Sequence, residues 1–115
     1  MIINDDCLTA MQKMEDNSID FVVTDPPYGL NFMGKKWDGR VPHIEIWQEV
    51  FRIAKPGSML AAFGGSRTHH RLMCAIEEGG WEIRDVIMWV FGRKLSIRFI
   101  KKNYLKGCNY AVSQR

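Results

Sequence analysis

The chain has 115 residues, of which 46% are hydrophobic and 25% charged, a composition typical of one soluble globular domain. No apolar run approaches the ~20 residues that span a membrane, and the acidic amino-terminal stretch lacks the features of a signal peptide. The three cysteines are widely spaced and odd in number, so they offer neither a CxxC metal pair nor a disulfide framework. We therefore expect a reduced, cytoplasmic protein without a membrane segment or a metal site.

The net charge of +3 conceals an uneven distribution. Residues 1–92 carry 9 basic and 13 acidic side chains, a net charge of −4, whereas residues 93–115 carry 7 basic side chains and no acidic one. We predict a domain over residues 1–92 and a divergent basic tail over residues 93–115. The tail has two interpretations at this stage: it contacts nucleic acid, or it does not belong to the packed domain.

Strands and helices alternate along the predicted domain. Apolar runs predict strands at 1–4, 19–24, 59–63 and 81–91, and helical spacing predicts helices within 5–15, from Pro42 to about 54, and at 69–80. This order predicts an α/β fold with a mostly parallel sheet and helices on both faces. The large aromatic residues Trp47, Phe51, Trp81 and Trp89 are expected in the core.

Ligands of such sheets bind beyond the carboxyl ends of the strands. Three loops are predicted to follow strand ends, at residues 5–7, 25–29 and 64–68, and a parallel sheet would bring them to one rim. We expect the functional site at this rim.

The loop after the second predicted strand reads Asp25-Pro26-Pro27-Tyr28. The Asp25 carboxylate and the Pro26 carbonyl are hydrogen-bond acceptors, the two prolines fix φ and stiffen the loop, and Tyr28 offers a flat ring. Two acceptors beside a ring suit a planar heterocycle held by its exocyclic amine. The alternative interpretation is a plain turn, in which Asp25 caps the strand and the prolines stop it.

The stretch TDPPYG resembles the catalytic motif of the amino-methyltransferases that use S-adenosylmethionine to methylate adenine N6 or cytosine N4 in DNA. The resemblance extends through KKWD, EIWQEVFRIAKPGSMLAAFGG, RTHHRLMCAIEEGGWEIRD and MWVFG, and so over residues 1–92. It is greatest to the class in which this motif comes first, notably its phage and prophage members. The resemblance implies a Rossmann-like fold, S-adenosylmethionine as cofactor and double-stranded DNA as partner, with adenine N6 favoured by the acid at the first motif position.

The resemblance also implies roles for single residues. Asp25 and the Pro26 carbonyl would bind the target amine, and Tyr28 would stack on a base flipped out of the duplex. Asp6 matches the acid that contacts the cofactor's adenine, although it also suits a helix N-cap, and Asp25 would lie near the cofactor as well.

Four further residues suit contact with DNA. They are basic or aromatic and lie in loops at the predicted rim: Lys35, Lys36, Trp37 and Arg67. Trp37 is equally consistent with a loop anchor, and Arg67 with a solvated side chain.

One expected feature is absent from the sequence. The class carries a glycine-rich cofactor loop of the form Phe-x-Gly-x-Gly late in the chain, and the stretch FGGS at 63–66 does not match it in position. We therefore expect a partial methyltransferase, truncated and inactive alone, with the tail translated out of frame. A non-catalytic remnant or a small basic nucleic-acid-binding protein is the alternative, and both a homo-oligomer and a complementing chain stay open as partners.

Overall fold

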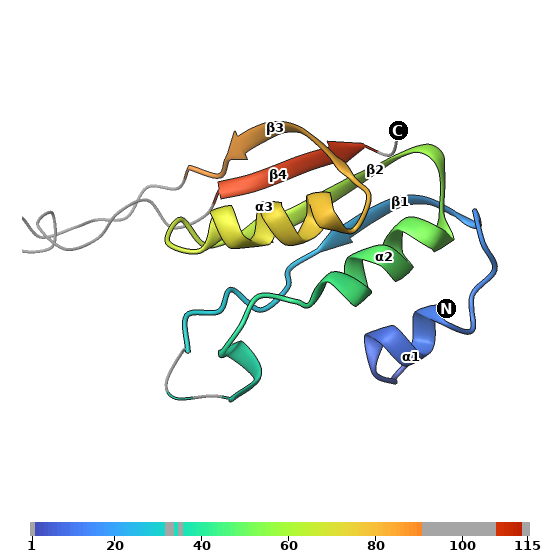
Figure 1. The fold of residues 1–115 in the computed structure, drawn as a ribbon, viewed down its shortest axis with the longest axis horizontal. Helices are drawn as coiled ribbons and strands as arrows, with labels where there is room; N and C mark the ends of the chain where they lie inside the picture. The colour runs from blue at the N-terminus through green and yellow to red at the C-terminus, as the bar shows by residue number, and fades with distance from the viewer. Residues whose placement is uncertain (1, 32–33, 35, 91–107, 114–115) are drawn as a thin grey trace, which may run out of the picture.

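The computed structural model describes residues 2–31, 34, 36–90 and 108–113. Its elements are, in chain order, α1 (Cys7–Met11), β1 (Ile19–Thr24), the 3-10 helix η2 (Lys36–Asp38), α2 (Ile44–Ile53), β2 (Ala54–Gly64), α3 (His69–Glu78), β3 (Glu82–Met88) and β4 (Cys108–Ser113). Figure 1 shows one sheet with α2 and α3 packed against it and α1 beside α2. The predicted α/β class is confirmed.

The order of the strands in the sheet is β1-β2-β4-β3. β1 and β2 are parallel, and β4 runs antiparallel to both of its neighbours, so β1, β2 and β3 point the same way. Their carboxyl ends therefore share one edge of the sheet. Because Thr24 pairs with Ala62, the loop that follows β1 begins beside the last residues of β2.

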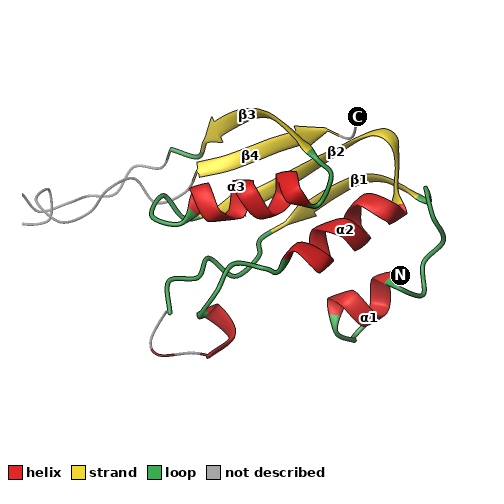
Figure 2. Cartoon of the chain, viewed as in Figure 1, coloured by secondary structure: helices red, strands yellow, loops and turns green. Residues whose placement is uncertain are grey.

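The core lies between the sheet and the helices α2 and α3, which lie on the same side of the sheet in Figure 2. Side chains of β2 alternate, with Leu60 and Ala62 buried and Met59 exposed. The buried positions form one cluster with residues of both helices, namely Trp47 and Val50 of α2 and Leu72 and Ile76 of α3. Burial of side chains of this size contributes about 1.5–3 kcal/mol each, so this cluster is the main source of stability.

Trp81 closes the core between α3 and β3. Its indole Nε1 donates a hydrogen bond to the Trp47 carbonyl at 3.2 Å, and its ring meets Phe51 edge-on with 5.5 Å between the centroids. The chain also needs a glycine at this turn, because a Cβ on Gly79 would lie 2.5 Å from the Trp47 Cβ. The predicted core positions Trp47, Phe51 and Trp81 are thus confirmed as packing residues.

The opposite face of the sheet carries exposed apolar side chains. Phe21 and Val23 of β1 are 52% and 63% exposed, and Met59 of β2 lies beside Phe21 in the register. The sequence predicts helices on both faces, but within the described residues both packed helices lie on one. The reason is topological: right-handed crossovers from β1 to β2 and from β2 towards β3 move in the same direction and place α2 and α3 on the same side.

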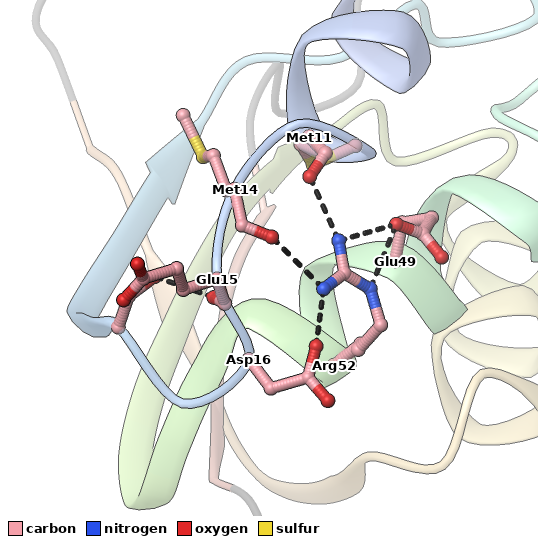
Figure 3. Close-up of polar contacts among 7 residues, drawn as sticks. Met11, Met14, Glu15, Asp16, Glu49 and Arg52 are labelled. Atoms are coloured by element: carbon pink, nitrogen blue, oxygen red, sulfur yellow. Dashed lines mark hydrogen bonds and ion pairs between the residues drawn. The ribbon is translucent and has the colours of Figure 1, made fainter.

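The short helix α1 is fixed to α2 by Arg52 (Figure 3). The guanidinium donates to the carbonyls of Met11 and Met14 at 2.8 and 3.0 Å, and to the carboxylates of Glu49 and Asp16. All five of its N–H groups are used in this way. Because a helix of five residues is not stable in isolation, these bonds hold α1 in place.

Two predicted elements differ in extent. Residues 2–4 do not form a strand, and Ile2 is 97% exposed, because these residues pair with no strand of the described sheet and the outer edge of β1 stays open. The stretch 55–58, predicted to end the helix, lies within β2, which starts at Ala54 directly after α2. The register of β1 shifts there between Ile19 and Phe21 to accommodate the extra residues of β2.

The prediction that Trp89 belongs to the core is wrong. Its side chain is 60% exposed and contacts Phe63, with 6.3 Å between the ring centroids, because it follows the edge strand β3. β4 was not predicted, since it lies in the segment 93–115 that was assigned to a divergent tail. In the described ranges, no helix has both the length and the apolar character needed to cross a membrane.

Candidate active site

The loop Asp25–Gly29 leaves the carboxyl end of β1 at the shared edge of the sheet. Asp25 is exposed, whereas Pro26 is buried. No described residue donates a hydrogen bond to the Pro26 carbonyl. The expected pair of acceptors at a strand end is therefore present.

Asp25 and Tyr28 contact one another. The Tyr28 hydroxyl donates a hydrogen bond of 2.6 Å to Asp25 Oδ1. Partial burial raises the pKa of Tyr28 to about 12, with further contributions from this hydrogen bond and from the negative charge of Asp25. The phenol therefore keeps its proton at neutral pH and fixes one carboxylate oxygen, while Asp25 Oδ2 has no partner among the described residues.

Asp38 holds the backbone of this loop and was not among the predicted site residues. Its side chain is only 4% exposed, and Oδ1 accepts hydrogen bonds from the amides of Tyr28 at 2.8 Å and Gly29 at 3.0 Å. Its own carbonyl accepts from the Asn31 amide. The signal for it was in the KKWD stretch, where a carboxylate follows an aromatic residue in a polar loop, but its buried position depends on the fold.

The loop between β2 and α3 packs against Tyr28 from the other side. The Thr68 hydroxyl donates to the Tyr28 carbonyl, and a Cβ on Gly65 would lie 3.3 Å from the Tyr28 ring. Gly29 is also required, since it has φ +68° and a Cβ there would lie 2.9 Å from the Val41 nitrogen. Two of the three loops expected at the rim, 25–29 and 64–68, thus lie together.

Asp6 lies at the start of α1 and acts as its N-cap. Its Oδ1 accepts hydrogen bonds from the amide and the hydroxyl of Thr9, at 3.1 and 3.3 Å. In the part of the chain that the structure describes, Asp6 Oδ2 has no partner, so the N-cap leaves one oxygen for a ligand. The cofactor contact implied by the resemblance stays a prediction.

The predicted DNA-contact residues are exposed where they are described. Trp37 is 65% exposed and directly precedes Asp38. Because the Asp38 carboxylate accepts a hydrogen bond from the Tyr28 amide, Trp37 is held close to the loop that contains Tyr28. Arg67 is exposed and has no hydrogen bond or ion pair within the described ranges. Lys36 is the first residue of η2, and only its main chain is described. Lys35 lies outside the described residues.

A family model described as DNA methylase, of the N6/N4 class, matches residues 19–107. The chain belongs to the N6/N4 DNA methylase family. The match extends past residue 92, where the sequence predicted a domain boundary, and that boundary stays a prediction.

Relatives of this methylase chain agree with the assignment. It is 25% identical to the type II methyltransferase M.HindIII of Haemophilus influenzae, over 76% of this chain and 42% of that protein. It is 26% identical to YubD of Escherichia coli, over 97% of this chain and 51% of that protein. The methylase chain thus spans about half the length of these curated relatives.

Solved structures show the same fold. The complex of M1.HpyAVI with SAM superposes with a TM-score of 0.70 at 18% identity, over 98% of this methylase and 54% of that chain. TTHA0409 of Thermus thermophilus, complexed with S-adenosyl-L-methionine, superposes with a TM-score of 0.65 at 18% identity, over 95% of this chain and 51% of that one. The predicted partial Rossmann-like methyltransferase fold is confirmed.

Proposed function

We propose that this chain carries the amine-binding part of a DNA methyltransferase. The reaction transfers a methyl group from S-adenosylmethionine to the exocyclic amine of a flipped base, with adenine N6 favoured over cytosine N4. The observation that carries the proposal is the pair of free acceptors, Asp25 Oδ2 and the Pro26 carbonyl, at the end of β1 beside the Tyr28 ring. Membership of the N6/N4 family supports it.

The acceptors act by holding the amine in one orientation. An exocyclic amine has two N–H groups, which match the Asp25 carboxylate and the Pro26 carbonyl, and two such bonds draw the nitrogen lone pair away from the ring and out of its plane. The nitrogen thereby becomes a better nucleophile without a covalent intermediate. Tyr28 stacks on the flipped base, and Asp38 and Thr68 hold its backbone so that the ring is positioned in advance.

The described residues fit the methyl donor in two places. Asp6 Oδ2 has no described partner and suits a hydroxyl or amino group of S-adenosylmethionine, and Asp25, which holds the target amine, is proposed to lie close to the cofactor as well. When bound, this cofactor supplies an activated methyl group on sulfur. The chain's own part is to hold the amine nitrogen in line with that group.

Double-stranded DNA is the proposed partner, with Lys35, Lys36, Trp37 and Arg67 as contacts. Exposure of Trp37 next to the anchored Asp38 supports this, because an exposed ring beside the base-binding loop suits an unstacked base or its neighbour. The cytoplasmic location, the out-of-frame origin of residues 93–115 and the absence of a metal stay predictions.

A second chain covers an open face of the sheet in our proposal. Within the described residues, Phe21 and Val23 leave an apolar face of the sheet exposed. A complementing chain or a second copy would cover that face. A non-catalytic, DNA-binding role for this chain alone is the competing proposal.

Calorimetry with S-adenosylmethionine discriminates between the two. Binding that is lost in Asp6→Ala and kept in Asp5→Ala would support the methyltransferase proposal, since the neighbouring Asp5 is engaged by Lys13 at 2.8 Å. No binding at millimolar cofactor, together with salt-sensitive DNA binding, would favour the non-catalytic role.

A further inference from the structure

A pocket of about 420 Å³ lies beside the proposed base-binding loop. One wall comes from Gly29 and the loop before α2, and the other from Thr68 and from α3 between Arg71 and its last residue, Glu78. The polar residues that line it, with the glycine that joins it to the loop, are Gly29, Arg40, His43, Thr68, Arg71 and Glu78. Nothing in the proposed methyl transfer uses this pocket.

Two arginines in the lining have no counter-charge. Arg40 and Arg71 are exposed, and neither guanidinium group makes a hydrogen bond or an ion pair with any described residue. Arg52, by contrast, uses all of its donors within the fold, and Arg84 pairs with Glu82. Glu78 lies seven residues beyond Arg71 on α3, about 10 Å further along the helix axis, so it does not neutralise it.

A guanidinium is the side chain best suited to phosphate, because its planar set of donors matches two phosphate oxygens at once. Two unpaired guanidinium groups facing one pocket therefore indicate an anionic ligand. The amino-terminal end of α3 lies at the Thr68 end of this wall, and its dipole favours negative charge there, whereas Glu78 lies at the opposite end of the helix.

The pocket is connected to the base-binding loop by two residues. Gly29 follows Tyr28 directly, and the Thr68 hydroxyl donates to the Tyr28 carbonyl; both residues line the pocket. A group bound in the pocket thus lies next to the ring that is proposed to stack on the base. A nucleotide rotated out of a duplex needs its flanking backbone to be held, and phosphate contacts supply this.

We propose that this pocket binds a backbone phosphate of DNA next to the flipped nucleotide, with Arg40 and Arg71 as its ligands. The inference rests on the proposed function for its ligand, and it assigns a site and two residues that the motif does not include. It also predicts that the contact is independent of base sequence, since phosphates are common to all nucleotides.

The test is the salt dependence of DNA binding, measured by fluorescence anisotropy with a labelled duplex. Arg40→Ala and Arg71→Ala should each reduce the slope of log K against log salt by about 0.9, the value for one lost phosphate contact in duplex DNA. Arg84→Ala removes the same charge from β3 and should leave the slope unchanged. Arg40→Lys and Arg71→Lys keep the charge and should retain most of the slope.

Two outcomes would overturn the phosphate site. One is a slope in both alanine variants equal to that of Arg84→Ala. The other is tighter binding of inorganic phosphate or AMP than of the duplex, followed by the amide shifts of Gly29 and Thr68, which would indicate a free nucleotide site. Failure of the methyltransferase proposal is separate, because absence of methyl transfer with the slope still reduced in Arg40→Ala and Arg71→Ala would leave the phosphate site in place.

Discussion

The buried carboxylate of Asp38 is predicted to stabilise the loop Asp25–Gly29, which is proposed to bind the base. It accepts two backbone N–H groups, from Tyr28 and Gly29, with only 4% of the residue exposed. Hydrogen bonds to a charged group contribute about 1.5–3 kcal/mol each, and a buried N–H left without a partner costs about 1–3 kcal/mol. Allowing for partial relaxation of the loop, we expect Asp38→Ala to lower the free energy of unfolding by about 3 kcal/mol.

Asp38→Asn separates the hydrogen bonds from the charge. The amide oxygen keeps an acceptor for both N–H groups, so we expect a loss of only about 1 kcal/mol. Asp20→Ala is the matched control, because the Asp20 side chain is 82% exposed and its ion pair with Lys55 is a surface contact. Such a pair contributes about 0–1 kcal/mol.

Urea denaturation followed by circular dichroism measures these differences, and amide exchange at Tyr28 and Gly29 locates them. On the scale of about 4–8 °C per kcal/mol for a domain of this size, Asp38→Ala should also lower Tm by about 15 °C. The reasoning fails if Asp38→Ala is no less stable than Asp20→Ala, or if the amides of Tyr28 and Gly29 exchange at wild-type rates in it.

Three other predictions follow from single contacts. Gly29→Ala should destabilise by about 1–3 kcal/mol more than Gly57→Ala in urea denaturation, because both have positive φ but only Gly29 lies against backbone atoms; equal losses would contradict this. Carbon-13 NMR, assigned with Tyr28→Phe, should give Tyr28 a pKa near 12 that Asp25→Asn lowers only in part, since burial is the larger cause. Because the pKa of Tyr28 in the folded protein exceeds the usual value of about 10, the protonated phenol stabilises the fold below pH ~10, and this stabilisation is lost as the pH rises towards 12. Arg52→Met should let the amides of α1 exchange at the rate of an unstructured peptide, with Arg52→Lys intermediate; wild-type protection in Arg52→Met would refute the role assigned to Arg52.

The sequence was informative where local chemistry decides the structure. The apolar run of β1, the stop at Pro26 and the amphipathic spacing of α2 are all local signals, and each element lies where it was predicted. The juxtaposition of the loops 25–29 and 64–68 was also predictable, because parallel strands share an edge.

Other features depend on contacts between distant segments. The buried role of Asp38 arises from hydrogen bonds across about ten residues of polar loop, which no periodicity reveals. Exposure of Trp89 follows from the edge position of β3, which strand order alone decides. The pocket with Arg40 and Arg71 joins a loop to a helix far along the chain, so neither arginine had a signal in its own surroundings.

The central claim is that Asp25 binds the amine that receives the methyl group. The most direct measurement is transfer of tritium from labelled S-adenosylmethionine to unmethylated DNA by a complete homologue that carries each substitution at the matching position, with digestion of the DNA to identify the methylated base. We predict N6-methyladenine as the product and a rate in Asp25→Ala of less than about a tenth of wild type, an effect above about 1.4 kcal/mol on the barrier, while Asp20→Ala stays fully active. Retention of more than that tenth in Asp25→Ala, or incorporation into protein instead of DNA, would contradict the account.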